Sequence, residues 1–342
     1  MGLFGSNDIT GIDIGAGSMK VVRIAKSGKR PKLLSAVLVE FPPDPTQAMS
    51  ISTDLHHLQA GKKIGSSNIV TLMPGKHLTI RSLTLPKMPL SELREAVRWE
   101  AKRHISYPID AAQIEYLIVG EKREGAVEKY DLVMVAAERG KVLEHLMPFR
   151  EAKIKVSAVD ANALSLRNVL RFREIPVDAN MLVVDLGAGK TEINIFKGGI
   201  LRFSRCIESG GLDMTRAIAD TLGIGLQEAE DKKRTLNVLT PAGQDKAIEA
   251  VRSRLDGLLM EIRRSVEYYK TTFREKNVES MILSGGVSLM QGTAEYCEQS
   301  LEHGVEIDRP FDCLSCKKNM LEEFGPVAPR FSAAIGLALR KI

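Results

Sequence analysis

Two short glycine turns, each preceded by an aspartate, carry residue types that bind phosphate. Asp13-Ile14-Gly15-Ala16-Gly17 and Asp185-Leu186-Gly187-Ala188-Gly189 each follow a β-rich apolar run, and a second β-rich run comes after each turn. Glycine lets backbone N–H groups approach an anion without a Cβ in the way. Two such hairpins that face each other would clasp a polyphosphate. Hydroxyl and ammonium groups come from Ser18 and Lys20 in the first turn and from Lys190 and Thr191 in the second.

The two aspartates indicate a metal ion. A carboxylate at Asp13 or Asp185 would reach a phosphate only through a cation and its waters, and Mg²⁺ suits that arrangement. A third glycine pair, Gly285-Gly286, follows a predicted strand over Ser280 to Leu283. One such turn is weak evidence, because Asp-X-Gly is common hairpin chemistry, but the set of three is much stronger. The chain has neither a GxxxxGK[ST] loop nor glycines that open a helix, so neither a P-loop nor a Rossmann fingerprint is present.

The spacing of the two turns indicates a duplicated lobe. The chain has 342 residues, enough for about two domains, and residues 13 and 185 lie 172 positions apart, close to half the length. Each turn also stands between matching β-rich runs, the later ones at Val21 to Ile24 and Ile193 to Phe196. The alternative is that two short glycine turns are alike by coincidence. The match of the aspartate, the two glycines and the flanking strands together favours duplication, in which each lobe begins with an equivalent hairpin.

Composition limits the class of protein. Apolar residues make up 44% and charged residues 27%, as in ordinary globular proteins, and we see neither a membrane span nor a secretion signal. We therefore expect a cytoplasmic protein. The net charge of +5 is interleaved along the chain, which does not indicate nucleic acid. Cys313 and Cys316 form a CxxC near Cys297 and His303, but the spacing is irregular for zinc, and we expect free thiols.

Two further segments shape the expected architecture. We expect a helix that begins at Ser91, with that serine as its cap and with Leu93, Val97 and Ala101 on one face. We expect two strands after it, over residues 115–119 and 130–136. Together these elements predict a compact inserted unit over residues 86–154. Trp99 and Tyr107 are expected in its core, with a partner groove as the alternative. Apolar residues from Ile248 to Phe273 keep three-and-four spacing, which predicts a long helix packed on its own domain rather than a coiled coil.

These motifs together resemble the superfamily of actin, Hsp70 and hexokinase-like ATPases. Residues 13–20 resemble its first phosphate loop, residues 185–191 its second, and Ser284-Gly285-Gly286-Val287-Ser288 its adenosine motif. Gly210-Gly211 with Asp213 resembles the glycine pair beside the nucleotide, and Ala229 to Lys233 resembles the Ala-Glu-x-x-Lys segment that flanks the adenosine. Residues 160–169 and 333–339 resemble its two connecting helices. The resemblance implies an α/β fold of two lobes, actin-like and ribonuclease H-like.

A narrower resemblance is to the PilM family of type IV pilus assembly. It rests on the MGLFG start, residues 85–89, residues 93–108 and residues 130–137. The insert resembles subdomain 1C, which that family shares with the division protein FtsA. The resemblance implies ATP and Mg²⁺ between two lobes, and capture of the cytoplasmic N-terminal tail of PilN by a groove involving lobe I and subdomain 1C. It also implies contacts with other inner-membrane platform proteins and the assembly ATPases, at the inner face of the inner membrane and with membrane association only through the partner.

The resemblance also implies boundaries and roles. Lobe I, subdomain 1A, is expected over residues 1–85, 155–178 and 330–342; subdomain 1C over 86–154; lobe II, subdomain 2A, over 179–211 and 279–329; and subdomain 2B over 212–278. Asp13 and Asp185 are the implied metal ligands. The implied nucleotide-binding residues are Gly15, Ala16, Gly17, Ser18, Lys20, Gly187, Ala188, Gly189, Lys190, Thr191, Gly210, Gly211, Glu230, Lys233, Gly285, Gly286 and Val287.

Catalysis and alternative functions stay open at this point. Asp160 and Glu192 are candidates for orienting an attacking water, but no general base is assigned, so we expect at most weak ATPase activity. One alternative is a small-molecule kinase of the same superfamily, for which we find no sugar-binding motif. The other is an FtsA-like polymerising protein tethered to the membrane, for which the residues after the closing helix provide no separate amphipathic anchor.

Overall fold

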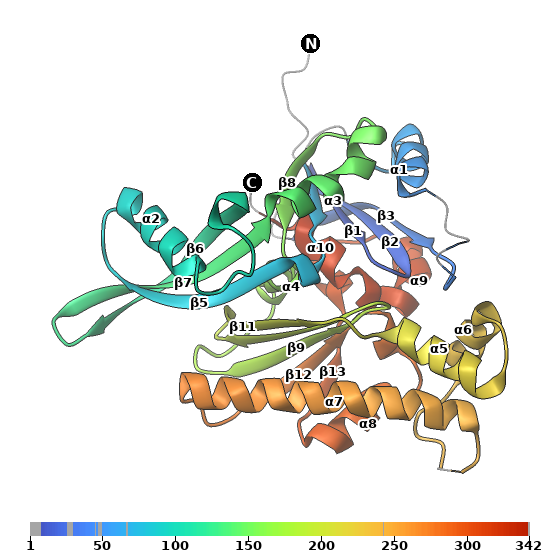
Figure 1. Ribbon diagram of the computed structural model, residues 1–342. Helices are drawn as coiled ribbons and strands as arrows, with labels where there is room; N and C mark the ends of the chain where they lie inside the picture. The colour runs from blue at the N-terminus through green and yellow to red at the C-terminus, as the bar shows by residue number, and fades with distance from the viewer. Residues whose placement is uncertain are drawn as a thin grey trace.

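The protein consists of two lobes and a projecting insert (Figure 1). The computed structural model describes residues 8–25, 30–44, 46, 50–65, 68–241 and 243–340; the MGLFG start lies outside these residues. Each lobe is built on a five-stranded sheet, and a three-stranded sheet forms the insert. Within the described ranges, no helix is both long enough and apolar enough to cross a bilayer.

The sheet of the first lobe has the strand order β3-β2-β1-β4-β8. Its strands are β1 (Asp8–Ile14), β2 (Ser18–Ala25), β3 (Lys32–Glu40), β4 (Ile69–Leu72) and β8 (Val156–Asp160). β2 is antiparallel to β1 and β3, whereas β1, β4 and β8 run parallel. The sheet is apolar on both faces because helices cover both: Ile12 packs against α1 (Ile51–Ala60), and Val22 against α10 (Ser332–Ala338).

The sheet of the second lobe repeats this arrangement, which confirms the duplication. Its order is β11-β10-β9-β12-β13, again with three antiparallel strands followed by parallel ones. Its strands are β9 (Asn180–Leu186), β10 (Thr191–Lys197), β11 (Ile200–Ile207), β12 (Ser280–Ser284) and β13 (Val305–Ile307). The two glycine turns close with equivalent hydrogen bonds, from Gly15 N–H to Ser18 O at 3.0 Å and from Gly187 N–H to Lys190 O at 2.9 Å.

The insert is a three-stranded sheet with one helix on it. β5 (Leu78–Pro86), β7 (Val127–Glu138) and β6 (Ala112–Glu124) lie in the order β5-β7-β6, and the core forms where α2 (Leu90–Ala101) packs on β7. Leu93, Val97 and Ala101 are buried in that core, as their spacing predicts. The boundary at residue 86 is wrong, however, because β5 pairs with β7 rather than with a strand of lobe I.

The far boundary of the insert also differs from the expected one. α3 (Arg139–Glu151) follows β7 but packs on the first lobe, where Phe149 joins an apolar cluster with Ile12 and Leu55. Thr71 Oγ1 of β4 and His145 Nε2 of α3 lie 3.2 Å apart. The residues that form the insert's own sheet and core therefore run from about Leu78 to Glu138 rather than over 86–154.

Two expectations for α2 are wrong. The helix begins at Leu90, one residue before Ser91, and no side chain caps its start. Trp99 is 66% exposed rather than in the core, and the Nζ of Lys102 lies 3.7 Å from the centre of its ring. The ammonium group of Lys102 therefore covers one face of the indole at the surface, a cation–π contact that burial patterns in a sequence do not reveal.

α7 (Lys246–Phe273) is the predicted long helix, and its apolar face packs on its own lobe. Val251, Leu255 and Ile262 are fully buried against the sheet and α5 (Gly211–Leu222). The Oη of Tyr269 donates a hydrogen bond to Asn180 Oδ1 at 2.6 Å, which joins the end of the helix to the start of β9. The packed alternative, not the coiled coil, is therefore confirmed.

Two helices connect the lobes. α4 (Asn162–Leu170) packs on the second lobe's sheet, whereas α10 packs on that of the first. They also contact each other, and Asn168 Nδ2 donates to Gly336 O at 2.9 Å. The remaining helices are α6 (Leu226–Thr235), α8 (Thr293–Leu301) and α9 (Lys318–Phe324), with 3₁₀ turns η2 (Gly75–His77), η3 (Ile109–Ala111), η4 (Gly286–Leu289), η5 (Pro310–Cys313) and η6 (Gly325–Phe331).

The packing of α7 makes a stability prediction. Leu255→Ala leaves a cavity between the helix and the sheet and should lower the free energy of unfolding by about 2–5 kcal/mol. Met260, on the same helix, is 54% exposed, so Met260→Ala should change it by less than about 0.5 kcal/mol. Denaturant unfolding followed by circular dichroism measures both; equal losses would contradict the packing described.

Candidate nucleotide site between the lobes

The glycine turns of the two lobes meet at the centre of the molecule. A Cβ built on Gly17 would lie 2.8 Å from the Cβ of Ala188, and one built on Gly189 would lie 2.8 Å from the Cβ of Ala16. Carbon atoms do not approach so closely without a shift of one of them, so glycine is required at both positions. The contact holds the two predicted phosphate loops face to face.

Both loop lysines lie beside carboxylates. Lys20 Nζ lies 3.1 Å from Asp13 Oδ2, and Lys190 forms an ion pair with Glu192, the next residue but one on β10. Glu192 is 3% exposed, so its carboxylate is removed from water, whereas the Lys190 side chain stays partly exposed. An anion that entered between the loops would therefore compete with these carboxylates for both ammonium groups.

Asp185 is a buried carboxylate with a like charge nearby. Asn162 Nδ2 donates to its Oδ2 at 2.6 Å. Burial first, and then the charge of Asp13, raise the pKa of Asp185 above its ordinary value, while Lys190 and the bond from Asn162 oppose the rise. A cation between the two aspartates would relieve this repulsion, so the pair fits Mg²⁺ held partly by water and phosphate. The described residues contain no group of three or more His, Cys, Asp or Glu side chains that would hold a metal alone.

The third glycine pair lies against the second loop. A Cβ on Gly285 would lie 2.5 Å from Asp185 Oδ1, and Gly285 N–H donates to Pro329 O at 3.0 Å. Val287, two residues later in η4, lies against Gly211, where a built Cβ would be 2.9 Å from Val287 Cγ2. The structure thus brings the three glycine motifs together around Asp185, as their sequence pattern predicts.

The Gly210-Gly211 pair opens α5 and is bound to the second loop. Gly211 N–H donates to Gly187 O at 3.0 Å, and Leu212 N–H donates to Ala188 O at 2.7 Å. Asp213 Oδ2 accepts from Gly210 N–H at 3.0 Å, which caps the helix. The backbone donors of this helix start are therefore already used within the site.

Glu230 and Lys233 of α6 join that helix to α5. Lys233 Nζ donates to Gly211 O at 2.9 Å, to Thr215 Oγ1 at 2.7 Å and to Glu230 Oε2 at 2.6 Å. Thr191 is similarly committed, because its Oγ1 donates to Ser209 O at 2.8 Å. The polar atoms of these three predicted side chains bind the walls of the site to each other.

Both candidates for orienting a water already have partners. Glu192 is paired with Lys190, as above. Asp160 accepts from Arg340 Nη1 at 2.6 Å through Oδ2 and from Ala161 N–H at 2.8 Å through Oδ1. Burial raises the pKa of Asp160 even though Arg340 opposes the rise.

Sequence reasoning missed an ionic contact between the lobes. Glu40, at the end of β3, accepts from Arg234 Nη2 of α6 at 2.8 Å and from Arg330 Nη1 of η6 at 2.6 Å. Phe41 N–H donates to Gly17 O at 3.0 Å, and the Arg330 side chain lies 3.9 Å from a Cβ built on Gly286. Glu40 therefore joins the end of β3, beside the first glycine turn, to α6 and η6. No motif marks it, because its partners lie 194 and 290 residues away.

The CxxC belongs to packing. Cys313 Sγ donates to Pro310 O at 3.1 Å, and burial raises the pKa of this thiol to about 12. Cys313 and Cys316 pack on the apolar cluster around Phe331, whereas Cys297 lies in the core beneath α7. All four cysteines, 206, 297, 313 and 316, are free thiols.

The meeting of the loops makes a first prediction for the site. Gly17→Val puts three carbon atoms where the Ala188 methyl group lies, which should cost about 1–3 kcal/mol of folding free energy or force the loops apart. Gly257→Ala in α7 is the matched control, because a Cβ at that position would meet nothing within 4 Å. The substitution also replaces a glycine in the interior of a helix, so it should leave the stability unchanged or raise it. Thermal unfolding of both variants decides; an unchanged melting temperature in Gly17→Val would contradict the close contact.

The Glu40 contact makes a pH prediction. Burial alone would raise its pKa, but hydrogen bonds from Arg330 and Arg234 outweigh burial and lower the pKa below the ordinary 4.5. The stabilisation is therefore complete above pH 4.5 and is lost as the pH falls through the lower folded-state value. Glu40→Gln should melt below the wild type at pH 6, and the gap should narrow as the pH approaches 3. A gap that is constant with pH would show that the carboxylate charge contributes nothing.

Comparisons with known proteins agree with this geometry. The chain is similar over its length to a solved structure described as "PilM-PilN type IV pilus biogenesis complex", with a TM-score of 0.83, 28% identity, and coverage of 97% of this chain and 98% of that chain. The ethanolamine utilization protein EutJ from Carboxydothermus hydrogenoformans matches with a TM-score of 0.57, 14% identity, and coverage of 99% and 91%, and a MamK double helical filament with 0.53, 13%, and 97% and 98%. These last two show the fold alone, which is the actin-like ATPase fold.

Two further comparisons concern the sequence. The cell division protein FtsA of Neisseria meningitidis serogroup B is 26% identical over 185 residues, which are 47% of this chain and 42% of that protein. The chain thus spans about half the length of the curated relatives it matches. A family model described as "Type IV pilus assembly protein PilM" matches residues 11–342. The chain therefore belongs to the PilM family of type IV pilus assembly proteins.

Proposed function

We propose that this protein binds MgATP between its two lobes and couples nucleotide state to its grip on the N-terminal cytoplasmic tail of PilN, within the pilus platform at the inner face of the inner membrane. The observation that carries the proposal is the convergence of three glycine turns, two aspartates and two lysines at one point between duplicated lobes. Family membership and the solved PilM–PilN complex support the partner.

Each part of the site has a role in this proposal. Residues 15–17 and 187–189 lie against the phosphates, with the backbone N–H groups of residues 16, 17, 188 and 189 as donors because those of Gly15 and Gly187 close the turns, and Lys20 and Lys190 supply positive charge. Asp13 and Asp185 hold Mg²⁺, which neutralises phosphate charge when it is bound. The remaining residues flank the nucleoside and the loops: Ala16, Ser18, Ala188, Thr191, Gly210, Gly211, Glu230, Lys233, Gly285, Gly286 and Val287.

The same geometry argues for slow hydrolysis. Phosphoryl transfer to water needs a group that positions the water in line with the bond that breaks. Asp160 and Glu192, the candidates for that task, are bound to Arg340 and Lys190. In this proposal the bound nucleotide therefore acts mainly by favouring the closed arrangement of the lobes, through its higher affinity for that state.

Glu192 offers a route from the nucleotide to the insert. A Cβ on Gly75 would lie 2.6 Å from Glu192 Oε1, so the 3₁₀ turn η2 packs directly on this carboxylate. η2 leads into β5, the first strand of the insert. A phosphate that attracts Lys190 would weaken its pairing with Glu192 and shift the charge on which η2 rests. We infer that nucleotide state reaches the insert through Lys190, Glu192 and Gly75.

The nucleotide site is tested by titration calorimetry with MgATP. Asp13→Asn removes a carboxylate that would hold Mg²⁺, and Lys20→Ala removes a cation beside the phosphates, so each should weaken binding by at least about tenfold. Lys318→Ala is the control, because Lys318 is an exposed lysine on α9, outside the cleft. Affinity unchanged in both site variants would contradict the assigned pocket.

The coupling is tested with a synthetic peptide of the PilN N-terminus and the full chain. Its affinity should change several-fold when MgATP is added, and Glu192→Gln should remove the change while peptide binding remains. Hydrogen exchange should slow in lobe I and the insert when the peptide binds. Peptide binding that ignores nucleotide would contradict the coupling alone, whereas no binding at all would contradict the partner.

A further inference from the structure

Two buried polar atoms beside Asp185 have no hydrogen-bond partner among the residues that the structure describes. They are the carboxamide oxygen Oδ1 of Asn162 and the hydroxyl oxygen Oγ of Ser284. Asn162 is 1% exposed and Ser284 is 0% exposed, so bulk water reaches neither side chain. A buried polar atom without a partner costs free energy, and native proteins rarely keep one unless a water molecule, an ion or a ligand binds it. Both atoms therefore point to a group that binds beside Asp185.

Ser284 and Asp185 share one face of the second lobe's sheet, and α4 covers that face. Val183 of β9 and Ile282 of β12 pack against α4 in one apolar cluster. Side chains alternate along a strand, so Asp185 and Ser284, each two residues further along, lie on the same face. They are also direct neighbours, because Ser284 pairs with Asp185 in the parallel ladder between the two strands. The first turn of α4, which carries Asn162, reaches the same carboxylate.

The carboxylate of Asp185 is held at both of its oxygens. Asn162 Nδ2 donates to Oδ2 at 2.6 Å, and a Cβ built on Gly285 would lie 2.5 Å from Oδ1. Nδ2 and Oδ1 of Asn162 belong to one planar carboxamide, so the unpaired oxygen lies next to the carboxylate that the same side chain holds. We refer to Asn162, Asp185 and Ser284 as the Asp185 wall. Its two unpaired atoms are both oxygens, which suit a hydrated Mg²⁺.

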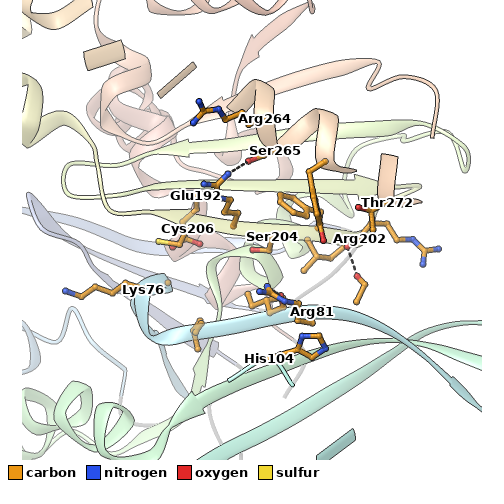
Figure 2. Close-up of a pocket in the computed structure, with 18 of the residues that line it drawn as sticks. Lys76, Arg81, His104, Glu192, Arg202, Ser204, Cys206, Arg264, Ser265 and Thr272 are labelled. Atoms are coloured by element: carbon orange, nitrogen blue, oxygen red, sulfur yellow. Dashed lines mark hydrogen bonds between the residues drawn. The ribbon is translucent and has the colours of Figure 1, made fainter. Parts of the chain in front are cut away.

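The neighbouring carboxylate and hydroxyl on β10 and β11 already have partners. Glu192 pairs with Asp185 across β9 and β10, but Lys190 neutralises its charge. Figure 2 shows Glu192 and Ser204 on the lining of a separate recess of about 960 Å³, between the insert and the second lobe. Ser204 Oγ donates to Asn194 Oδ1 at 2.8 Å. Ser204 is therefore a serine of the same sheet whose hydroxyl is bonded, in contrast to that of Ser284.

We propose that Asn162 Oδ1 and Ser284 Oγ bind water molecules of the divalent cation that Asp13 and Asp185 hold. Mg²⁺ dehydrates reluctantly and keeps several waters in protein sites. A cation polarises its waters, which makes them good donors, and an amide oxygen can only accept. Asn162 is thus also the positioning residue of Asp185. This inference rests on the proposed MgATP site; an ordered water without a cation is the competing occupant of the Asp185 wall.

The first test compares melting temperatures with and without MgATP. Ser284→Ala removes a hydroxyl that has no partner, so the nucleotide-free variant should melt at the same temperature as the wild type or higher. The rise in melting temperature that MgATP produces should nevertheless shrink, because a water of the cation loses its partner. Ser204→Ala is the matched control. It breaks an existing hydrogen bond, so the nucleotide-free variant should melt lower while the rise with MgATP stays the same.

The second test uses titration calorimetry to separate the cation from the nucleotide. Ser284→Ala should weaken the binding of MgATP by about two- to tenfold, which corresponds to the loss of one hydrogen bond. Asn162→Ala, which also releases Asp185, should weaken it more. With EDTA present, ATP should bind Ser284→Ala as it binds the wild type, because only the cation's waters use the hydroxyl.

Three results would overturn the inference while the MgATP site stands. They are an unchanged MgATP affinity in Ser284→Ala, an equal loss of ATP affinity with Mg²⁺ and with EDTA, and a lower melting temperature of nucleotide-free Ser284→Ala. The last result would show that an ordered water alone occupies the Asp185 wall. A wild-type protein that binds no MgATP would overturn the proposed function and this inference together.

Discussion

The contact between the two glycine turns is the constraint on which the rest of the structure depends. Gly17 faces Ala188, and Gly189 faces Ala16, so a side chain larger than a hydrogen atom at either glycine would force the lobes apart. Because the turns touch, the charge of Asp13 adds to burial in raising the pKa of Asp185, and the charges of Lys190 and Lys20 both oppose that rise. The ion pair of Glu40 with Arg234 and the contact between α4 and α10 hold the lobes in this arrangement.

Much of this arrangement could be predicted from local sequence. The duplicated Asp-x-Gly-Ala-Gly turns, the spacing of apolar residues along α7 and the buried face of α2 depend on residues within a few turns of one another, and the structure has each of them. The site residues come together because equivalent hairpins stand at equivalent places in two equivalent sheets.

Pairings between distant segments could not be predicted in that way. The strand over 78–86 has the same composition whether it joins lobe I or the insert, and only its pairing with β7 decides. No local sequence pattern marks Glu40, because its two arginine partners lie far along the chain. Trp99 looks like a core residue by type, but Lys102 covers one face of its ring at the surface. In each case tertiary contacts, which a single sequence does not display, determine the outcome.

The central claim is that one Mg²⁺–nucleotide complex lies between the two glycine turns, with Asp13 and Asp185 at the metal. Anomalous diffraction from crystals grown with Mn²⁺ and a non-hydrolysable ATP analogue tests it most directly. Our account predicts a manganese peak between these carboxylates, with the phosphates against residues 15–17 and 187–189. A peak elsewhere, or a nucleotide bound outside the cleft, would contradict it.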